Sequence, residues 1–248
     1  MIRAGRPDAA LAPLVLNADG SSQSALAPVE LGNPDVLGQV DSAVRGCGRI
    51  LVGVARGPLL ASAALRLAVL DCTLLEGTAP PGAGPRTYVP VADAGTATER
   101  LSQSVRSGPL AALTLAGLLR VTDRPPVAEG LAAESAAYST LLTGPEFAAS
   151  AGAAVGRCRD RVRARLHGAC AGAGIEAPAF AARVTAHLDD FFQLPELAMG
   201  LNTGAGRTVG VTRRVGRRRA AWPALTGHRL GAVAARDWRL VDHLADHR

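Results

Sequence analysis

The chain of 248 residues contains no lysine, and all 27 of its basic residues are arginine. Its formal net charge of +6 would suit a nucleic acid partner, yet only 3% of its residues are aromatic. Proteins that bind nucleic acids usually combine a basic patch with aromatic side chains on which bases stack. We therefore expect no nucleic acid partner and interpret most arginines as solvated surface residues.

Cysteine and long apolar runs are also scarce. The four cysteines form no CxxC pair and have no metal-ligand spacing with the five histidines, so we expect reduced structural thiols and no metal site. No run reaches the roughly 18 apolar residues that a membrane span needs. Arg6, Pro7 and Asp8 interrupt the start of the chain. These absences predict a cytoplasmic protein with no membrane partner.

The hydrophobic content, 48%, is that of a globular protein, and the length suits one large domain or two small ones. Apolar runs at 50–54 and 70–75 predict buried strands that alternate with helices, which indicates an αβαβ unit with a parallel strand pair. A proline in residues 88–91 predicts an edge strand there. Residues 77–86 read as a turn-rich linker.

The remaining elements follow from apolar periodicity and from glycine and proline breaks. Residues 1–34 are expected to be loosely ordered apart from one short strand. The expected strands are 14–16, 162–166 and 182–186, and the expected helices are 34–44, one from residue 58, 94–106, 110–120, 127–143, one from 206 to 225 and 232–244.

Residues 167–206 hold two glycine-punctuated turns, and each delivers one glutamate, Glu176 or Glu196. Gly172 and Gly174 leave a main chain almost without side chains, so a ligand can approach its N–H groups closely. This arrangement predicts an oxyanion hole. Glu196 follows a proline-fixed turn among apolar residues, where burial favours the neutral acid and proton exchange near neutral pH. The structural alternative is that both carboxylates cap helix starts.

Three segments resemble the enoyl-CoA hydratase/isomerase (crotonase) family over roughly residues 160–245. They are HGACAGAGIE, FFQLPELAMGLNTGAG and the tail VTRRVGRRRAAWPALTGHRLGAVAARDWRLVDHLA. The two glutamates lie twenty residues apart, as in the hydratases of this family. The resemblance implies an α/β fold with a partial Clp-protease/crotonase-like core in residues 151–248. An αβ and helical region of unassigned role would precede it in residues 1–150.

The resemblance also implies an activity on acyl-CoA. Glu176 and Glu196 would be the acid/base pair of an enoyl-CoA hydratase, which is a lyase, or of an isomerase. The N–H of Ala173 would donate to the oxyanion of a thioester enolate, and Gly172, Gly174 and Gly204 would border the substrate. The coenzyme A thioester would be the substrate, with no further cofactor. The family resemblance predicts a homo-oligomer of three or six subunits.

Departures from the family pattern support a second hypothesis. The small-residue loop before an aspartate, which supplies the second oxyanion donor in the family, has no counterpart here. Arg207 and Arg239 stand where glycine is usual, and Asn202-Thr203 replaces Ile-Pro. The alternative is therefore a non-catalytic or incomplete relative that acts as a binding or assembly subunit.

Other candidate residues have a structural interpretation. His167 is expected at a strand end, Asp189 in a solvated turn with Asp190, and Cys170 in packing, since no base is identifiable beside it. Five arginines could approach an anionic ligand such as the phosphates of coenzyme A, although a solvated helix face is the favoured reading. They are Arg213, Arg214, Arg217, Arg218 and Arg219.

Overall fold

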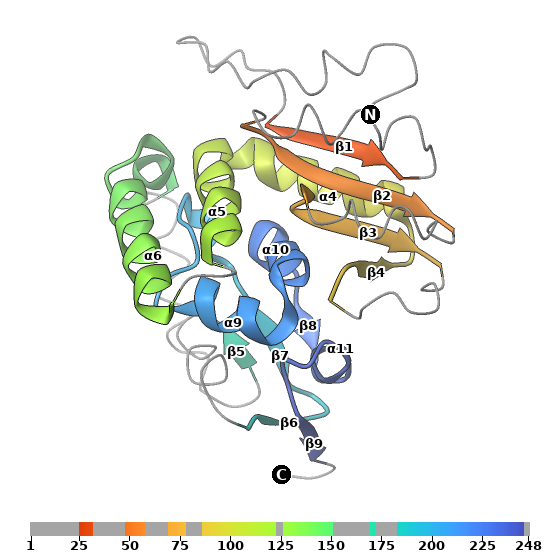
Figure 1. Cartoon of the computed structure of the whole chain (residues 1–248). Coiled ribbons are helices and arrows are strands. Elements are labelled where there is room, and N and C mark those ends of the chain that lie inside the picture. The colour runs from red at the N-terminus through yellow and green to blue at the C-terminus, as the bar shows by residue number, and fades with distance from the viewer. Residues whose placement is uncertain are drawn as a thin grey trace. The chain divides into compact units, whose positions relative to one another are not determined.

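A computed structural model describes residues 25–31, 48–57, 69–77, 86–122, 126–150, 169–171 and 183–245. The chain divides by its contacts into two compact units, residues 1–109 and 110–248. The division expected from the family resemblance lies at residue 150 instead. The described elements mix helices and strands, so the expected α/β class is confirmed (Figure 1).

The first unit contains a parallel sheet of four strands in the order β1-β2-β3-β4. The strands are β1 (Leu26–Glu30), β2 (Ile50–Arg56), β3 (Cys72–Glu76) and β4 (Val89–Val91). Burial of nearly every residue in β2 and β3 explains why both strands read as continuous apolar runs. The expected parallel pair and the edge position of the proline-containing strand are confirmed.

The strand β1 was not predicted, because Pro28 and its short length conceal it. A proline cannot donate a ladder hydrogen bond, and it is tolerated here because β1 is the second edge of the sheet. Residues 26–30 are therefore ordered where loose structure was expected.

Helix α4 (Ala94–Ser107) follows the sheet and contacts β2 and β3. The side chain of Asp93 accepts a hydrogen bond from the Thr96 N–H, which satisfies one of the free donors at the helix start. Ala97, Leu101 and Val105 recur at helical spacing on the buried face. The helix expected at 94–106 is confirmed.

The second unit combines helices with short strands. Its helices are α5 (Pro109–Thr122), α6 (Val127–Leu142), residues 145–150, the 3-10 turn η4 (Glu196–Met199), α9 (Arg207–Val215), α10 (Arg217–Thr226) and α11 (Ala232–Asp237). Strand β7 (Phe191–Gln193) pairs in parallel with β5 (Ala169–Ala171) and antiparallel with β8 (Leu230–Gly231). Strand β6 (Thr185–His187) pairs in parallel with β9 (His243–Ala245).

The predicted helices at 110–120 and 127–143 are confirmed, whereas two later ones need correction. The helix expected from 206 to 225 is broken at Gly216, whose φ of 84° lies outside the helical region. The helix expected at 232–244 ends at Asp237, because Arg239 adopts a φ of 66° and the chain turns into β9. Glycine adopts this conformation more readily than arginine does.

Several expected elements lie outside the described residues. They are the strand at 14–16, the helices at 34–44 and after residue 58, most of the linker at 77–86 and the strand at 162–166. The strand expected at 182–186 is found at Thr185–His187. None of the described helices is long and apolar enough to cross a membrane.

The carboxylate of Asp242 joins three elements of the second unit. Its Oδ2 accepts hydrogen bonds from the Val184 N–H at 2.7 Å and from Arg214 at 2.6 Å. The hydrogen bond from Val184, followed by the contact with Arg214, lowers the pKa of Asp242 below its ordinary value. A carboxyl whose pKa is lower in the folded state stabilises the fold above its unfolded pKa of about 3.9.

We predict that Asp242→Asn destabilises the protein at pH 7 and that the difference disappears at low pH. The stabilisation by Asp242 is fully present above about pH 4 and is lost as the pH falls through the lower folded value. Urea unfolding of both proteins across this range measures the difference. Asp237→Asn, which alters an exposed pair with Arg236, is the control. A difference that is equal at pH 7 and pH 3 would contradict the prediction.

Candidate functional site

A cavity of about 670 Å³ lies within the second unit, between α6 and the segment from η4 to the start of α9. We call it the Glu196 cavity. Its volume falls within the range of roughly 300–1,000 Å³ that is typical of small-molecule sites. It is lined by Leu131, Glu134, Ser135, Tyr138 and Ser139 of α6, and by Glu196, Met199, Gly204, Ala205, Gly206 and Arg207.

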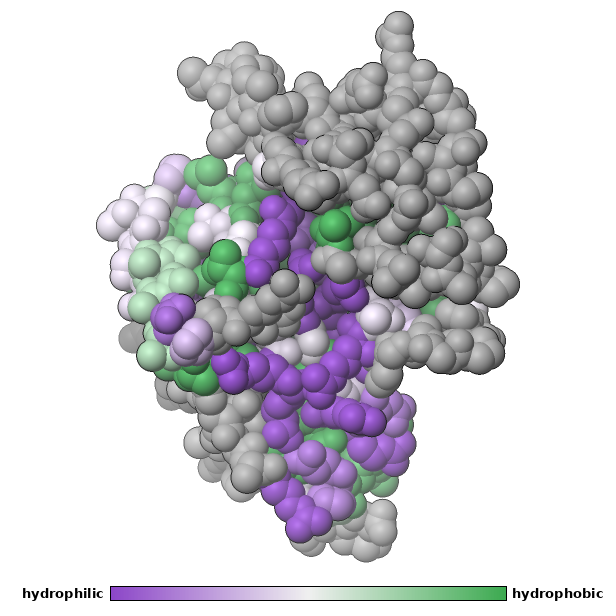
Figure 2. Space-filling view, in the orientation of Figure 1, coloured by the Kyte–Doolittle hydropathy of each residue, from purple (hydrophilic) through white to green (hydrophobic). Residues whose placement is uncertain are grey.

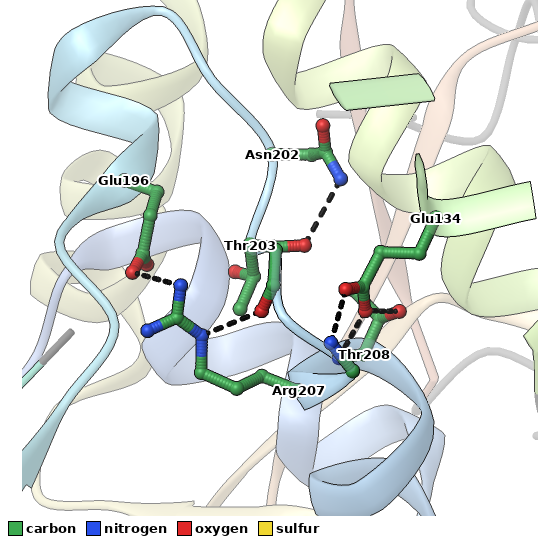
Figure 3. A network of polar contacts seen from close by, with 8 residues as sticks. Glu134, Glu196, Asn202, Thr203, Arg207 and Thr208 are labelled. Atoms are coloured by element: carbon green, nitrogen blue, oxygen red, sulfur yellow. Dashed lines mark hydrogen bonds and ion pairs between the residues drawn. The ribbon is translucent and has the colours of Figure 1, made fainter. Parts of the chain in front are cut away.

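Glu196 begins η4 and is only 4% exposed. Its Oε1 lies 3.0 Å from Nη2 of Arg207, a side chain that is buried as well (Figure 3). The Nε of Arg207 donates to the Gly204 carbonyl at 2.7 Å. The turn from Gly204 to Arg207 thus brings a compensating charge to a carboxylate that would be costly to bury alone.

The Arg207 contact changes the expected chemistry of Glu196. The predicted burial of this glutamate is confirmed, and burial by itself favours the neutral acid. A guanidinium at ion-pair distance favours the carboxylate. The sequence marks Arg207 only as a departure from the family, and nothing in the local pattern predicts its partner. In this structure Glu196 therefore lies against a cationic partner, and not among apolar residues alone as the sequence predicted.

Glu134 of α6 is a cavity-lining residue that the sequence did not predict. It is 3% exposed, and its carboxylate accepts hydrogen bonds from the Gly206 N–H at 2.5 Å and the Thr208 N–H at 2.9 Å (Figure 3). The Thr208 hydroxyl donates to the same carboxylate. These donors belong to the start of α9, where main-chain N–H groups lack helical partners and the helix dipole favours negative charge. Glu134 therefore caps α9 from another helix.

Two glycines mark close approaches around α6. A Cβ at Gly130 would lie 2.8 Å from Val209 of α9. A Cβ at Gly204 would lie 3.0 Å from the ring of Tyr138. The first glycine lets α6 pack closely on α9, and the second lets Tyr138 pack against the turn that contains Gly204.

The structure brings some of the predicted site residues together. Glu196 and Gly204 line the same cavity. Glu176, Ala173, Gly172 and Gly174 lie outside the described residues, so their roles stay predictions.

The strand that ends just before Gly172 pairs with the strand that comes shortly before Glu196. Strand β5 ends at Ala171, directly before Gly172, and pairs in parallel with β7 so that Ala171 is opposite Gln193. Glu196 follows three residues later. Paired strands lie about 4.8 Å apart. Ala171 and Gln193 therefore lie side by side at the same end of the parallel strand pair.

The predicted arginine group contributes to packing. Hydrophilic residues gather over α9, α10 and β9 in Figure 2. Arg214 pairs with Asp242, and the guanidinium of Arg219 lies 5.1 Å from the centre of the Trp238 ring. At least these two of the five arginines have structural partners.

Comparison with known proteins supports the family resemblance. No family model matches the chain. Over 88 residues it is 36% identical to the mevalonyl-coenzyme A hydratase SIDH of Beauveria bassiana (strain ARSEF 2860), a match that covers 36% of this chain and 31% of the relative. The chain thus spans about a third of the curated relative that it matches.

Two solved structures that are named as enoyl-CoA hydratases or isomerases also match the chain. An enoyl-CoA hydratase/isomerase-type protein of Mycobacterium abscessus is 28% identical, with 39% of this chain and 43% of that chain covered and a TM-score of 0.31. An enoyl-CoA hydratase of Thermoplasma volcanium GSS1 is 17% identical, with 91% and 70% covered and a TM-score of 0.32. Scores this low define no atom-by-atom correspondence. The curated match supports the family resemblance over its 88 residues.

We predict that Glu134→Gln lowers the free energy of unfolding by about 2–3 kcal/mol. The amide offers one acceptor oxygen where three donors now converge, and hydrogen bonds to a charged group are worth about 1.5–3 kcal/mol. Denaturant unfolding measures the loss. Glu129→Gln, at an exposed position on the same helix, should change stability by less than about 0.5 kcal/mol. Equal effects of the two substitutions would show that Glu134 is not an important cap.

A double-mutant cycle should detect coupling between Glu196 and Arg207. Arg207→Met alone leaves a buried carboxylate without its guanidinium, which typically costs about 3–5 kcal/mol. Combining it with Glu196→Gln should recover part of that loss, with a coupling energy of about 0.5–3 kcal/mol. The same cycle on the exposed pair of Glu99 and Arg106 is the control, with an expected coupling of about 0.2–1 kcal/mol. Additive effects at Glu196 and Arg207 would contradict the buried pair.

Proposed function

We propose that the chain acts on acyl-CoA thioesters by crotonase-type chemistry, as an enoyl-CoA hydratase or isomerase. The matched relative is named a mevalonyl-coenzyme A hydratase, and we carry over from it only the coenzyme A thioester as a substrate class. The observation that supports this proposal best is the parallel pairing of β5 with β7 beside a buried Glu196. In this pairing Ala171, which precedes Gly172 in the sequence, lies opposite Gln193, three residues before Glu196.

The proposed roles follow from the chemistry of a thioester. When a proton is added to or removed from the carbon next to the thioester carbonyl, the reaction passes through an enolate. The enolate oxygen needs preorganised hydrogen-bond donors. In our proposal the Ala173 N–H is one donor, and Gly172 and Gly174 keep side chains away from it. Removing one such donor typically costs about 2.7–4 kcal/mol of barrier. The glycine at 204 borders the substrate on the other side of the cavity.

The ion pair with Arg207 assigns the two acid/base roles in this proposal. Because the guanidinium favours the carboxylate, Glu196 accepts a proton from the attacking water. The water oxygen bonds to the β-carbon, and Glu176 donates a proton to the α-carbon. Two carboxyl groups can divide the acid and base roles when their environments give them different pKa values.

In this proposal no cofactor is required besides the thioester substrate. A cytoplasmic location and a homo-oligomer of three or six subunits remain predictions.

The second candidate is a non-catalytic relative that binds acyl-CoA or assembles with other subunits. The same ion pair favours it, because a glutamate that is held by a buried arginine is less available to a substrate. In this case the Glu196 cavity would bind a thioester without converting it.

Hydration of crotonyl-CoA, followed by the loss of absorbance of the conjugated thioester, tests the catalytic proposal. Glu176→Gln and Glu196→Gln should each lower kcat by about 100- to 10,000-fold, the usual contribution of a positioned acid or base. Glu129→Gln should leave kcat unchanged, because Glu129 is exposed and does not line the cavity. An inert protein whose melting temperature rises with acyl-CoA would favour the second candidate. An inert protein without such a shift would refute both for this substrate class.

A further inference from the structure

One nitrogen of the buried ion pair between Glu196 and Arg207 lacks a hydrogen-bond partner within the described part of the chain. It is Nη1 of Arg207, which is itself buried. The other two nitrogens of the guanidinium are occupied, since Nη2 contacts Glu196 and Nε donates to the Gly204 carbonyl (Figure 3). Arg207 is 6% exposed and lines the Glu196 cavity. A buried donor without an acceptor is costly, and an acceptor oxygen of a ligand in the cavity would remove that cost.

The charges around Arg207 decide which kind of acceptor fits. Among the described residues that line the cavity, Arg207 is the only basic one, whereas Glu134 and Glu196 are acidic. An anionic ligand group would therefore meet two carboxylates for one guanidinium, and like charges repel. A carbonyl oxygen is neutral and accepts a hydrogen bond from a guanidinium without that repulsion. The cavity thus favours a carbonyl oxygen over an anionic group.

The contact with Glu196 identifies which carbonyl of an acyl-CoA thioester this would be. Nη1 and Nη2 belong to one planar guanidinium, and Nη2 contacts the carboxylate that accepts a proton in the proposed reaction. An oxygen bound at Nη1 would thus lie near the reacting carbons, and in an enoyl thioester the oxygen conjugated with these carbons is that of the thioester carbonyl. Because Nη1 is itself buried, this contact requires the guanidinium to shift toward the cavity that it lines.

We propose that Arg207 is a further catalytic residue, whose Nη1 donates a hydrogen bond to the thioester carbonyl oxygen and to the enolate that forms from it. This inference rests on the proposed acyl-CoA function and deepens it. Position 207 is one of those at which the chain departs from the family pattern, so the resemblance does not imply this role.

The reaction step keeps a negative charge beside the guanidinium throughout. The attacking water gives its proton to Glu196, which becomes neutral, while the water oxygen bonds to the β-carbon. The electron pair of the double bond shifts toward the thioester, and the carbonyl oxygen becomes the enolate oxygen. The negative charge thus passes from Glu196 to the enolate, and Arg207 contacts both. A donor placed where charge develops stabilises the transition state.

Calorimetric titration of the full chain with butanoyl-CoA and S-butyl-CoA tests the proposal. The second ligand is a thioether with a methylene group in place of the carbonyl, and neither ligand has a double bond to hydrate. We expect the thioester to bind about tenfold more tightly, because its carbonyl accepts a hydrogen bond from a charged group. Glu196→Gln keeps the guanidinium and should keep this ratio. The double variant Glu196→Gln/Arg207→Met should reduce the ratio to about threefold or less.

The variants are chosen so that a change of fold is not mistaken for a change of binding. The double variant removes both members of the buried pair, so it leaves no buried charge without a partner and its fold should be intact. Glu99→Gln/Arg106→Met, at an exposed pair, is the matched control and should leave the ratio unchanged. A purely structural role of Arg207 would change the affinity for both ligands alike, whereas the proposal predicts a change in their ratio.

The outcomes separate this proposal from the one on which it rests. Equal affinity of the unaltered chain for both ligands would overturn the role of Arg207 and leave the acyl-CoA function standing. A preference that persists in the double variant, or one that is already lost in Glu196→Gln, would overturn the assignment to Arg207. Binding of neither ligand would overturn the acyl-CoA function and this inference together.

Discussion

The carboxylate of Glu134 holds α6 against the start of α9, and the Glu196 cavity depends on that contact. A buried carboxylate is costly unless donors surround it, and here two main-chain N–H groups and one hydroxyl supply them. The same contact fixes the loop of Gly204 to Arg207 between the two helices. If it were lost, the two walls of the cavity, α6 and the segment from Glu196 to Arg207, would lose a contact that holds them together.

The second unit uses this kind of contact twice. Glu146 accepts hydrogen bonds from the N–H groups of Leu110 and Ala111 at the start of α5, 36 and 35 positions earlier in the chain. Both caps therefore come from outside the helix that they stabilise. Most capping residues lie next to their helix in sequence. Here each capping carboxylate instead connects a helix start to a segment that is distant from it in the sequence.

The sequence predicted those features whose signal is local. Continuous apolar runs identified β2 and β3, and periodic ones identified α4, α5 and α6. The proline-fixed turn among apolar residues predicted the burial of Glu196, which is confirmed. Gly204, which the family resemblance placed beside the substrate, lines the same cavity. The misses share a physical cause, since each depends on something distant or on a rare conformation. Glu134 interacts 72 to 74 positions away, and Arg239 adopts a left-handed conformation that glycine usually occupies. Pro28 hides β1 because only its edge position makes the proline acceptable.

Ser150, in the helical residues 145–150, contacts the main chain of a residue that lines the Glu196 cavity. Its hydroxyl donates to the Met199 carbonyl at 2.7 Å, and Met199 lines the cavity. The main chain at Gly200 is packed so tightly against Glu146 and Phe147 that a Cβ there would lie 2.6 Å from the Glu146 carbonyl carbon. An insertion or a deletion just after Ser150 would therefore displace the turn that contains Glu196. Among related proteins, changes of length at this point should accompany changes in ligand preference, even when every residue that lines the cavity is the same.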